Sequence, residues 1–284
     1  MKPVRVASVQ ARPQSKTWED LVDGADVGHA LDLVDRAGHV ADIVCLPELY
    51  PSAGEAQLRL KARELGVYLI CGLREPGDGG VYNTATLIGP DGTVVGRQRK
   101  LFPTRVEVDR GTVPGDGYRV FATPLGKIGM IVCADLPFSR RGITELKRQG
   151  ADMIFNPSWW FALGEAYPAT IIARHLEYSL PIFGVDIARY ALATAENGGT
   201  TLFPAAGGYT TATIPPPCKT LDELGNWFKT KPSGINTMRD FVATLGEEED
   251  ILFSSVDVDA VRAFPGYYFS DDAPALGASE IAGR

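Results

Sequence analysis

The chain is predicted to fold as a mixed α/β domain, in which helices cover a sheet of parallel and antiparallel strands. Apolar strand-like runs alternate with helix-like segments over the first 190 residues. Turn residues between neighbouring strand-like runs add two β-hairpins to this alternation. No linker rich in Pro, Gly or Ser divides this part, so a single domain is expected over residues 1–284.

The expected strands are short apolar runs, and the expected helices repeat apolar residues at a spacing of three to four. Val4, Val6 and Val9 define the first strand, and Gly66 stands where a helix C-terminus favours glycine. In order, we expect a strand at 4–10, a helix at 18–37, a strand at 43–46, a helix at 55–65, a strand at 67–73, hairpins at 81–97 and 118–132, a helix at 140–149, a strand at 152–156, a helix at 169–179, and strands at 182–187 and 251–258.

The chain is less regular from about residue 196. Paired glycines at 198–199 and 207–208 and three prolines at 215–217 interrupt the segment 196–231. The acidic stretch 246–250 is expected to be a solvated turn. From about residue 270 we expect a loose tail or an arm that binds a partner.

Composition limits the function. The hydrophobic content of 45% indicates a folded globular chain, and the net charge of −7 argues against nucleic-acid binding. No apolar run approaches the roughly 20 residues needed to span a bilayer, so no membrane contact is expected. The first ten residues lack the apolar core of a signal peptide. We therefore expect a cytoplasmic protein.

The four cysteines do not indicate a disulfide framework. Cys45 and Cys71 lie in apolar runs and are expected to be small buried hydrophobic residues, while Cys218 follows prolines in an expected loop. No CxxC pair occurs, and the three histidines do not cluster with cysteines at a zinc-ligand spacing. A metal site is therefore not expected.

Three reactive side chains follow strand-like runs. Cys133 ends the run 127–133, Glu48 follows the run at 43–46, and Lys100 ends the run 94–100. A thiol, a carboxylate and an ammonium group are the parts of a nucleophilic active site. Since only the thiolate attacks, the thiol needs a nearby base or cation. A Cys–His pair through His175 is a weaker alternative, because this residue lies within an expected helix, and no GxSxG motif supports a serine nucleophile.

Each group has a specific role in this hypothesis. Glu48 would act as the general base for Cys133. Lys100 would pair with the thiolate or with Glu48, or would stabilise the oxyanion of a tetrahedral intermediate. The backbone N–H of Ala134 follows the nucleophile and would be a second oxyanion donor.

Together these motifs resemble the nitrilase, or carbon-nitrogen hydrolase, superfamily over residues 4–190. The order and spacing of the motifs carry the resemblance more than any single motif. The matching segments are 6–10, Leu46-Pro47-Glu48, 99–102, Glu107 with 112–115, 128–135, 150–152 and 156–159.

The resemblance implies a four-layer α-β-β-α sandwich that assembles as a homodimer or a larger homo-oligomer. It also implies a catalytic triad of Glu48, Lys100 and Cys133. Glu107 corresponds to the additional glutamate that positions the triad and substrate, and Trp159 to a residue that lines the substrate pocket. No metal or organic cofactor is implied.

Three departures from family patterns bear on the substrate. The Arg-Phe-Pro-Glu of many family amidases is replaced by the segment 136–139, and the frequent Glu-Asn pair of a later helix is Glu177-Tyr178. The Cys-Trp-Glu of typical nitrilases is absent, because Ala134 and Asp135 follow the cysteine. Amide or carbamoyl substrates are therefore favoured over nitriles.

The expected function is hydrolysis of a non-peptide C–N bond, in a small linear amide or N-carbamoyl compound, through a cysteine thioester. Two alternatives remain open at this point. An amine acceptor in place of water would make the protein an acyl- or amidotransferase. A non-catalytic binding or scaffold protein is the other alternative, although intact Glu48, Lys100 and Cys133 argue against it.

Overall fold

A computed structural model describes residues 2–160, 164–193, 201–215, 218–229 and 241–263. Its strands are β1 (Val4–Gln10), β2 (Ile43–Cys45), β3 (Pro51–Ser52), β4 (Tyr68–Gly77), β5 (Gly80–Ile88), β6 (Val94–Arg99), β7 (Val120–Thr123), β8 (Gly126–Met130), β9 (Met153–Pro157), β10 (Ile182–Val185), β11 (Tyr190–Ala193), β12 (Thr201–Ala206), β13 (Thr211–Thr213), β14 (Val242–Thr244) and β15 (Asp250–Val256). Its helices are α1 (Trp18–Val22), α2 (Val27–Gly38), α3 (Glu55–Leu65), α4 (Arg105–Val108), α5 (Asp135–Phe138), α6 (Arg140–Arg148), α7 (Ala166–Tyr178), α8 (Leu221–Lys229) and α9 (Val258–Ala263).

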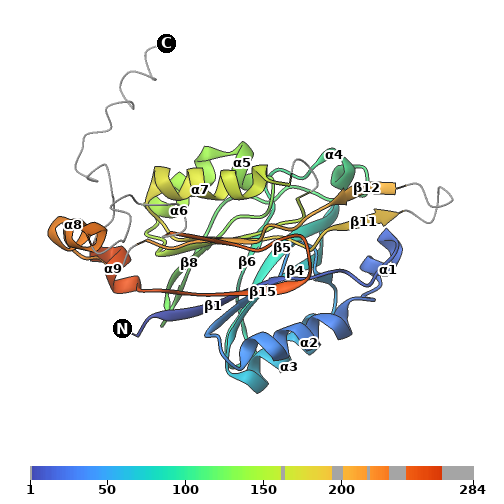
Figure 1. Ribbon diagram of the computed structural model, residues 1–284. Helices are drawn as coiled ribbons and strands as arrows, with labels where there is room; N and C mark the ends of the chain where they lie inside the picture. Colours follow the sequence, from blue (N-terminus) through green and yellow to red (C-terminus); the bar gives the residue numbers. More distant parts are fainter. Residues whose placement is uncertain (1, 161–163, 194–200, 216–217, 230–240, 264–284) are drawn as a thin grey trace, which may run out of the picture.

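Two sheets form the centre of the molecule. The first has the strand order β15-β1-β2-β4-β5-β6, with β3 also paired to β4, and the second has the order β14-β13-β10-β9-β8-β7. Helices α2 and α3 lie on the outer side of the first sheet, and α5, α6 and α7 lie on the outer side of the second (Figure 1). The expected four-layer α-β-β-α sandwich is therefore confirmed.

The alternation of side chains along the strands explains the layers. In β2, Ile43 and Cys45 belong to the large core cluster that includes residues of both sheets. Val44, between them, belongs to a second cluster together with Leu33 of α2 and Leu58 of α3. Each strand of this kind is buried on both faces, as expected when helices cover a parallel sheet.

Parallel pairing brings several strand ends to one edge. Strands β1, β2 and β4 are parallel neighbours in the first sheet, and β8, β9 and β10 are parallel neighbours in the second. The segments that follow β2, β8 and β9 therefore leave the sheets at their carboxyl ends, where α/β proteins place their ligands.

The prediction of one helix over 18–37 is wrong, because the chain forms two helices there, α1 and α2. Gly24 separates them with a φ of 85°, a left-handed conformation that a helix interior does not contain. Asp26, just before α2, is fully buried and accepts a 2.6 Å hydrogen bond from the Ser15 hydroxyl. The break thus lets the Asp26 carboxylate anchor the segment that leads into α1.

Most other expected elements are confirmed with shifted ends. Both hairpins form, as β5–β6 and β7–β8. Helix α7 begins at Ala166, three residues earlier than expected, with Pro168 in its first turn, where a missing N–H costs little. The segment expected to be irregular contains β12, β13 and α8. The predicted tail from residue 270 lies outside the described residues, and none of the described helices is long and apolar enough to cross a membrane.

Candidate active site

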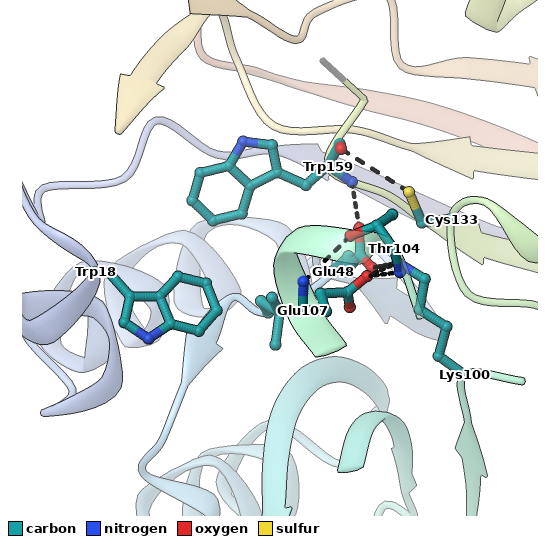
Figure 2. Close-up of a pocket in the computed structure, with 8 residues that line it drawn as sticks. Trp18, Glu48, Lys100, Thr104, Glu107, Cys133 and Trp159 are labelled. Carbon is teal, nitrogen blue, oxygen red and sulfur yellow. Dashed lines mark hydrogen bonds and ion pairs between the residues drawn. The ribbon is translucent and has the colours of Figure 1, made fainter. Parts of the chain in front are cut away.

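A small pocket, partly open to solvent, contains the reactive side chains that the sequence predicted. Cys133, Glu48 and Lys100 all line it, together with Glu107 and Trp159 (Figure 2). The structure thus brings together all five side chains that the sequence singled out. The pocket is also lined by three residues that the sequence reasoning missed, namely Trp18, Leu49 and Thr104.

Glu48 is held in place by β4 and by a residue that follows β9. It is 3% exposed and lies three residues beyond β2. Its Oε2 accepts a 2.8 Å hydrogen bond from the Trp159 N–H, which follows β9 in the other sheet. Gly72 in β4 lets this segment pack closely, because a Cβ there would lie 2.5 Å from the Pro47 oxygen. The carboxylate is therefore fixed between the two sheets.

Lys100 joins two buried carboxylates. Its Nζ lies 2.7 Å from Glu48 Oε1 and 2.7 Å from Glu107 Oε2, and its side chain is 2% exposed. Asn83 of β5 bridges the same two acids, because its Nδ2 donates to Glu48 Oε1 at 2.8 Å and to Glu107 Oε1 at 2.6 Å. The sequence reasoning missed Asn83, although a buried amide inside a strand is a signal that it has polar partners.

Helix α4 presents Glu107 to this network. The Thr104 N–H donates to Glu107 Oε2 at 2.7 Å, and the Thr104 hydroxyl accepts from the Glu107 N–H in return. This capping box fixes the carboxylate at the start of the helix. Both oxygens of Glu107 are therefore occupied by donors from Asn83, Lys100 and Thr104.

The charges in this cluster shift one another's proton affinities. Burial alone would lower the pKa of Lys100, but Glu48, Cys133 and Glu107 together raise it above its usual value. Burial would likewise raise the pKa of Glu107, but Lys100 and the hydrogen bonds of its neighbours lower it. The ammonium and the Glu107 carboxylate are therefore both charged at neutral pH.

Cys133 sits on a sharp turn after β8. Its φ of 44° is unusual for a residue with a side chain, and its N–H donates to the Pro157 oxygen at 2.9 Å. Asn156 supports the same turn, since its Nδ2 donates to the Ile131 oxygen at 2.8 Å. The Sγ lies 3.8 Å from the Trp159 oxygen. Two adjacent strands of the second sheet thus hold the thiol at the pocket.

The thiol is protonated at rest. Burial raises the pKa of Cys133 well above its usual value, and the Glu48 carboxylate raises it further, while Lys100 opposes these effects. A neutral thiol beside a carboxylate differs from a pre-formed thiolate, because its proton must move before the sulfur can attack. Glu48 is the carboxylate within reach.

The residues after Cys133 link the thiol to the lysine segment. None of the hydrogen bonds within the described part of the chain uses the Ala134 N–H, so this donor is available. Asp135 is buried, and its two oxygens accept from the N–H groups of Leu101 at 2.8 Å and Phe102 at 2.9 Å. Burial raises the pKa of Asp135 to about 6. Its carboxylate connects the turn of Cys133 to the residues that follow Lys100.

The other reactive residues of the sequence lie outside the pocket. His175 is buried in α7, and its Nδ1 lies 2.8 Å from the Leu180 oxygen, so the structure gives no support to a Cys–His pair. Cys45 and Cys71 are fully buried, as predicted, and Cys218 is buried in the loop before α8. Among the described residues, no three His, Cys, Asp or Glu side chains form a group that could hold a metal ion.

This geometry suits nucleophilic attack at a carbonyl carbon. A buried thiol, a carboxylate and an ammonium group line one small space, and the unused Ala134 N–H follows the thiol in the chain. A family model described as carbon-nitrogen hydrolase matches residues 5–265 of the chain. The chain therefore belongs to the carbon-nitrogen hydrolase family.

Relatives of this family are similar over part or most of the chain. The omega-amidase NIT2 of Xenopus tropicalis is 32% identical over 179 residues, which cover 51% of this chain and 65% of that protein. The omega-amidase NIT2 of Homo sapiens is 25% identical over 249 residues, 79% of each chain. The match to the Xenopus protein thus spans less than two thirds of its length.

Solved structures agree with the fold. A carbon-nitrogen hydrolase from Helicobacter pylori G27 superimposes with a TM-score of 0.69 at 18% identity, covering 93% of this chain and 94% of that chain. Saccharomyces cerevisiae Nit3, a member of the nitrilase superfamily, superimposes with a TM-score of 0.67 at 19% identity, covering 92% and 93%. The four-layer sandwich is thus the fold of the nitrilase superfamily.

Proposed function

We propose that the protein hydrolyses the C–N bond of a small linear amide or N-carbamoyl compound through a thioester on Cys133. The observation that carries this proposal is the meeting of a buried neutral thiol with a carboxylate and an ammonium group in one pocket. The pocket has little free space, which favours a small substrate.

In the first half-reaction, Glu48 takes the thiol proton as Sγ of Cys133 attacks the carbonyl carbon. Lys100 Nζ and the Ala134 N–H stabilise the oxyanion that forms. The C–N bond then breaks, Glu48 returns its proton to the nitrogen, and ammonia or an amine leaves. The acyl or carbamoyl group remains bound to sulfur as a thioester.

In the second half-reaction, water attacks the thioester carbonyl and Glu48 accepts one of its protons. The C–S bond breaks, the acid leaves, and the proton on Glu48 returns to the thiolate of Cys133. One water is consumed and no electrons are exchanged with a cofactor. A nucleophilic cysteine has precedent in a protein of similar fold, because a mutant amidase from Nesterenkonia carries the acetamide moiety of fluoroacetamide covalently added at its active-site cysteine.

The test is turnover together with intact mass. Purified protein is incubated with short amides, N-carbamoyl glycine and a short nitrile, and ammonia release is measured. We expect release from amides or carbamoyl compounds and a transient thioester mass on Cys133 in the wild-type protein. Glu48→Gln should form neither the thioester nor ammonia, because the thiol proton has no acceptor, and Cys133→Ala should release no ammonia. The control is Cys218→Ala, a buried cysteine outside the pocket. Full turnover by Cys133→Ala would refute the mechanism.

A further inference from the structure

Asp186 is a fully buried residue that takes no part in the proposed reaction. It follows β10 directly, at the edge of the second sheet where Cys133 follows β8 and Trp159 follows β9. Its Oδ1 accepts hydrogen bonds from the Trp160 N–H at 2.8 Å and from the Ile187 N–H at 2.9 Å. The first of these bonds connects Asp186 to the segment that follows β9.

The peptide unit that Asp186 binds also faces the thiol. The bond between Trp159 and Trp160 is trans, so its C=O and N–H groups point in opposite directions. The N–H donates to Asp186, and the Trp159 oxygen lies 3.8 Å from Cys133 Sγ. The N–H of Trp159 itself donates to Glu48 Oε2 at 2.8 Å (Figure 2). The backbone of Trp159 thus contacts both the nucleophile and its base.

The side chain of Asp186 replaces a backbone acceptor at this point. The Ser158 N–H donates to the Val185 oxygen at 2.8 Å, which is the last backbone contact from this segment to β10 before Trp160. The backbone of Asp186 is occupied elsewhere, because its N–H donates to the Thr210 hydroxyl at 3.0 Å and its oxygen accepts from that hydroxyl at 3.2 Å. The carboxyl Oδ1 therefore holds the Trp160 N–H where the regular pairing of the strands has ended.

Asp186 acts as an uncharged acceptor. Its Oδ2 is buried and has no hydrogen-bond partner among the described residues. Burial raises the pKa of this carboxyl well above its usual value, and the negative charge of Glu48 raises it further. Tyr167 is a second titratable side chain that interacts with it electrostatically. A protonated carboxyl still offers Oδ1 as an acceptor, and it adds no charge beside Glu48, Lys100 and Glu107.

We infer that Asp186 is a positioning residue for the proposed reaction. Its Oδ1 orients the peptide between Trp159 and Trp160, and this peptide sets the separation of the thiol from its base. The inference rests on the proposed function, because it takes Glu48 as the base for Cys133. Without the Oδ1 acceptor, the buried Trp160 N–H would lack a partner, so the peptide would rotate toward another acceptor. The thiol and the carboxylate would then lose the backbone that both of them contact.

The test is alkylation of Cys133 by iodoacetamide, followed by peptide mass between pH 6 and pH 8. In this reaction the C–S bond forms, iodide leaves and Glu48 takes the thiol proton. For the wild-type protein we expect the rate to change less than about threefold over this range, because the proton stays within the pair of thiol and carboxylate. In Asp186→Ala and Asp186→Val only thiolate formed by loss of a proton to solvent reacts, so the rate should rise about tenfold per pH unit.

Turnover gives a second measurement on the same variants. Asp186→Ala and Asp186→Val should lower kcat about a hundredfold and change KM less than about threefold, because the pocket lining stays while the reacting groups are misplaced. Asp186→Asn keeps an uncharged Oδ1 at the same place, so it should restore the flat pH profile and most of kcat.

The matched control is Asp152→Val. Asp152 is also buried and accepts from the Lys127 N–H at 2.7 Å, but it precedes β9 and so lies at the end of that strand away from Cys133. We expect this variant to be less stable and to keep the flat alkylation profile. A steep profile in Asp152→Val would mean that any loss of packing uncouples the thiol, and it would overturn the inference.

Three other results would also overturn it: a steep profile in the wild-type protein, a flat profile in Asp186→Ala or Asp186→Val, and a steep profile in Asp186→Asn. The asparagine variant is isosteric, so its profile decides the question even where the other two variants do not fold. Ammonia release is measured separately. Its absence from the wild-type protein, with the expected alkylation profiles, would refute the proposed function alone, whereas ammonia release with equal profiles in all variants would refute only the role of Asp186.

Discussion

Replacing Glu107 with glutamine is expected to lower the free energy of unfolding by about 2–4 kcal/mol, more than an isosteric change at a surface site. Three donors converge on this carboxylate: Asn83 Nδ2 at 2.6 Å on Oε1, and Lys100 Nζ and the Thr104 N–H, each at 2.7 Å, on Oε2. Glutamine has one acceptor oxygen and an NH₂ group, so at least one buried donor must face another donor.

The least costly arrangement keeps the glutamine oxygen toward Lys100 and turns its NH₂ toward Asn83. One buried donor then lacks an acceptor, which costs about 1–3 kcal/mol, and the contact with Lys100 loses its charge, which costs about 1 kcal/mol more. Asn83 could flip its amide, but its oxygen would then face Glu48 Oε1 and transfer the penalty there. The cost can be moved within the network but not removed.

The assay is urea unfolding at fixed protein concentration, with Glu75→Gln as the matched control. Glu75 also accepts from three side-chain donors, on Thr84 and Arg99, but its side chain is 21% exposed, so water can satisfy a lost partner. We expect its substitution to cost less than about 1 kcal/mol. Equal stability of the Glu107→Gln and Glu75→Gln proteins would refute the reasoning from buried donors.

The difference in the free energy of unfolding between the wild-type and Glu107→Gln proteins should become smaller at low pH. Lys100 and the surrounding hydrogen bonds make the pKa of Glu107 lower in the folded than in the unfolded state. The unfolded chain then binds the proton more readily, so Glu107 stabilises the fold above its unfolded pKa of about 4.3. This contribution is lost as the pH falls through the lower pKa of the folded state. Over that pH range the wild-type and Glu107→Gln proteins should approach the same free energy of unfolding.

Two further predictions follow from neighbouring segments. Asp135→Asn should lower kcat/KM about tenfold at pH 8 but less at pH 5, because the pKa of about 6 means that the wild-type carboxyl is itself protonated at the lower pH; an equal loss at both pH values would contradict this. Gly72→Ala should destabilise the fold by about 1–3 kcal/mol and reduce ammonia release, because its Cβ would lie 2.5 Å from the Pro47 oxygen. Gly117→Ala, where a Cβ meets nothing within 4 Å, is its control in both unfolding and turnover, and equal effects of the two would contradict the packing argument.

Sequence patterns were sufficient for the layers and for the main site residues because both depend on local features. Alternating apolar residues mark buried strands, and a reactive side chain just after such a strand has a predictable position at the edge of a sheet. Cys133 and Glu48 could be found in this way. The split between α1 and α2 could not, because Gly24 is tolerated in a helical pattern and only the buried Asp26 explains why the helix stops.

The residues that the sequence did not reveal act across long distances in the chain. Asn83 bonds to Glu48 across 35 positions and to Glu107 across 24. Trp18 reaches the pocket from a helix whose pattern predicts only a core contact. No local spacing identifies such residues, because their roles depend on how the two sheets and α4 are packed together.

The buried cluster also explains why a neutral thiol suits this site better than a pre-formed thiolate. With Cys133 protonated, Glu48, Glu107 and Lys100 sum to one negative charge; when the proton moves to Glu48, the thiolate, Glu107 and Lys100 sum to the same value. The proposed proton transfer therefore leaves the net charge of a desolvated space unchanged, and the protein need not stabilise an additional buried ion. Glu107 has a separate effect, because it shares Lys100 Nζ with Glu48; without Glu107, Lys100 would pair with the thiolate alone and hold it too firmly for attack. Removing the charge of Glu107 should therefore slow acylation as well as destabilise the fold, whereas a purely structural Glu107 would leave the acylation rate of the folded protein unchanged.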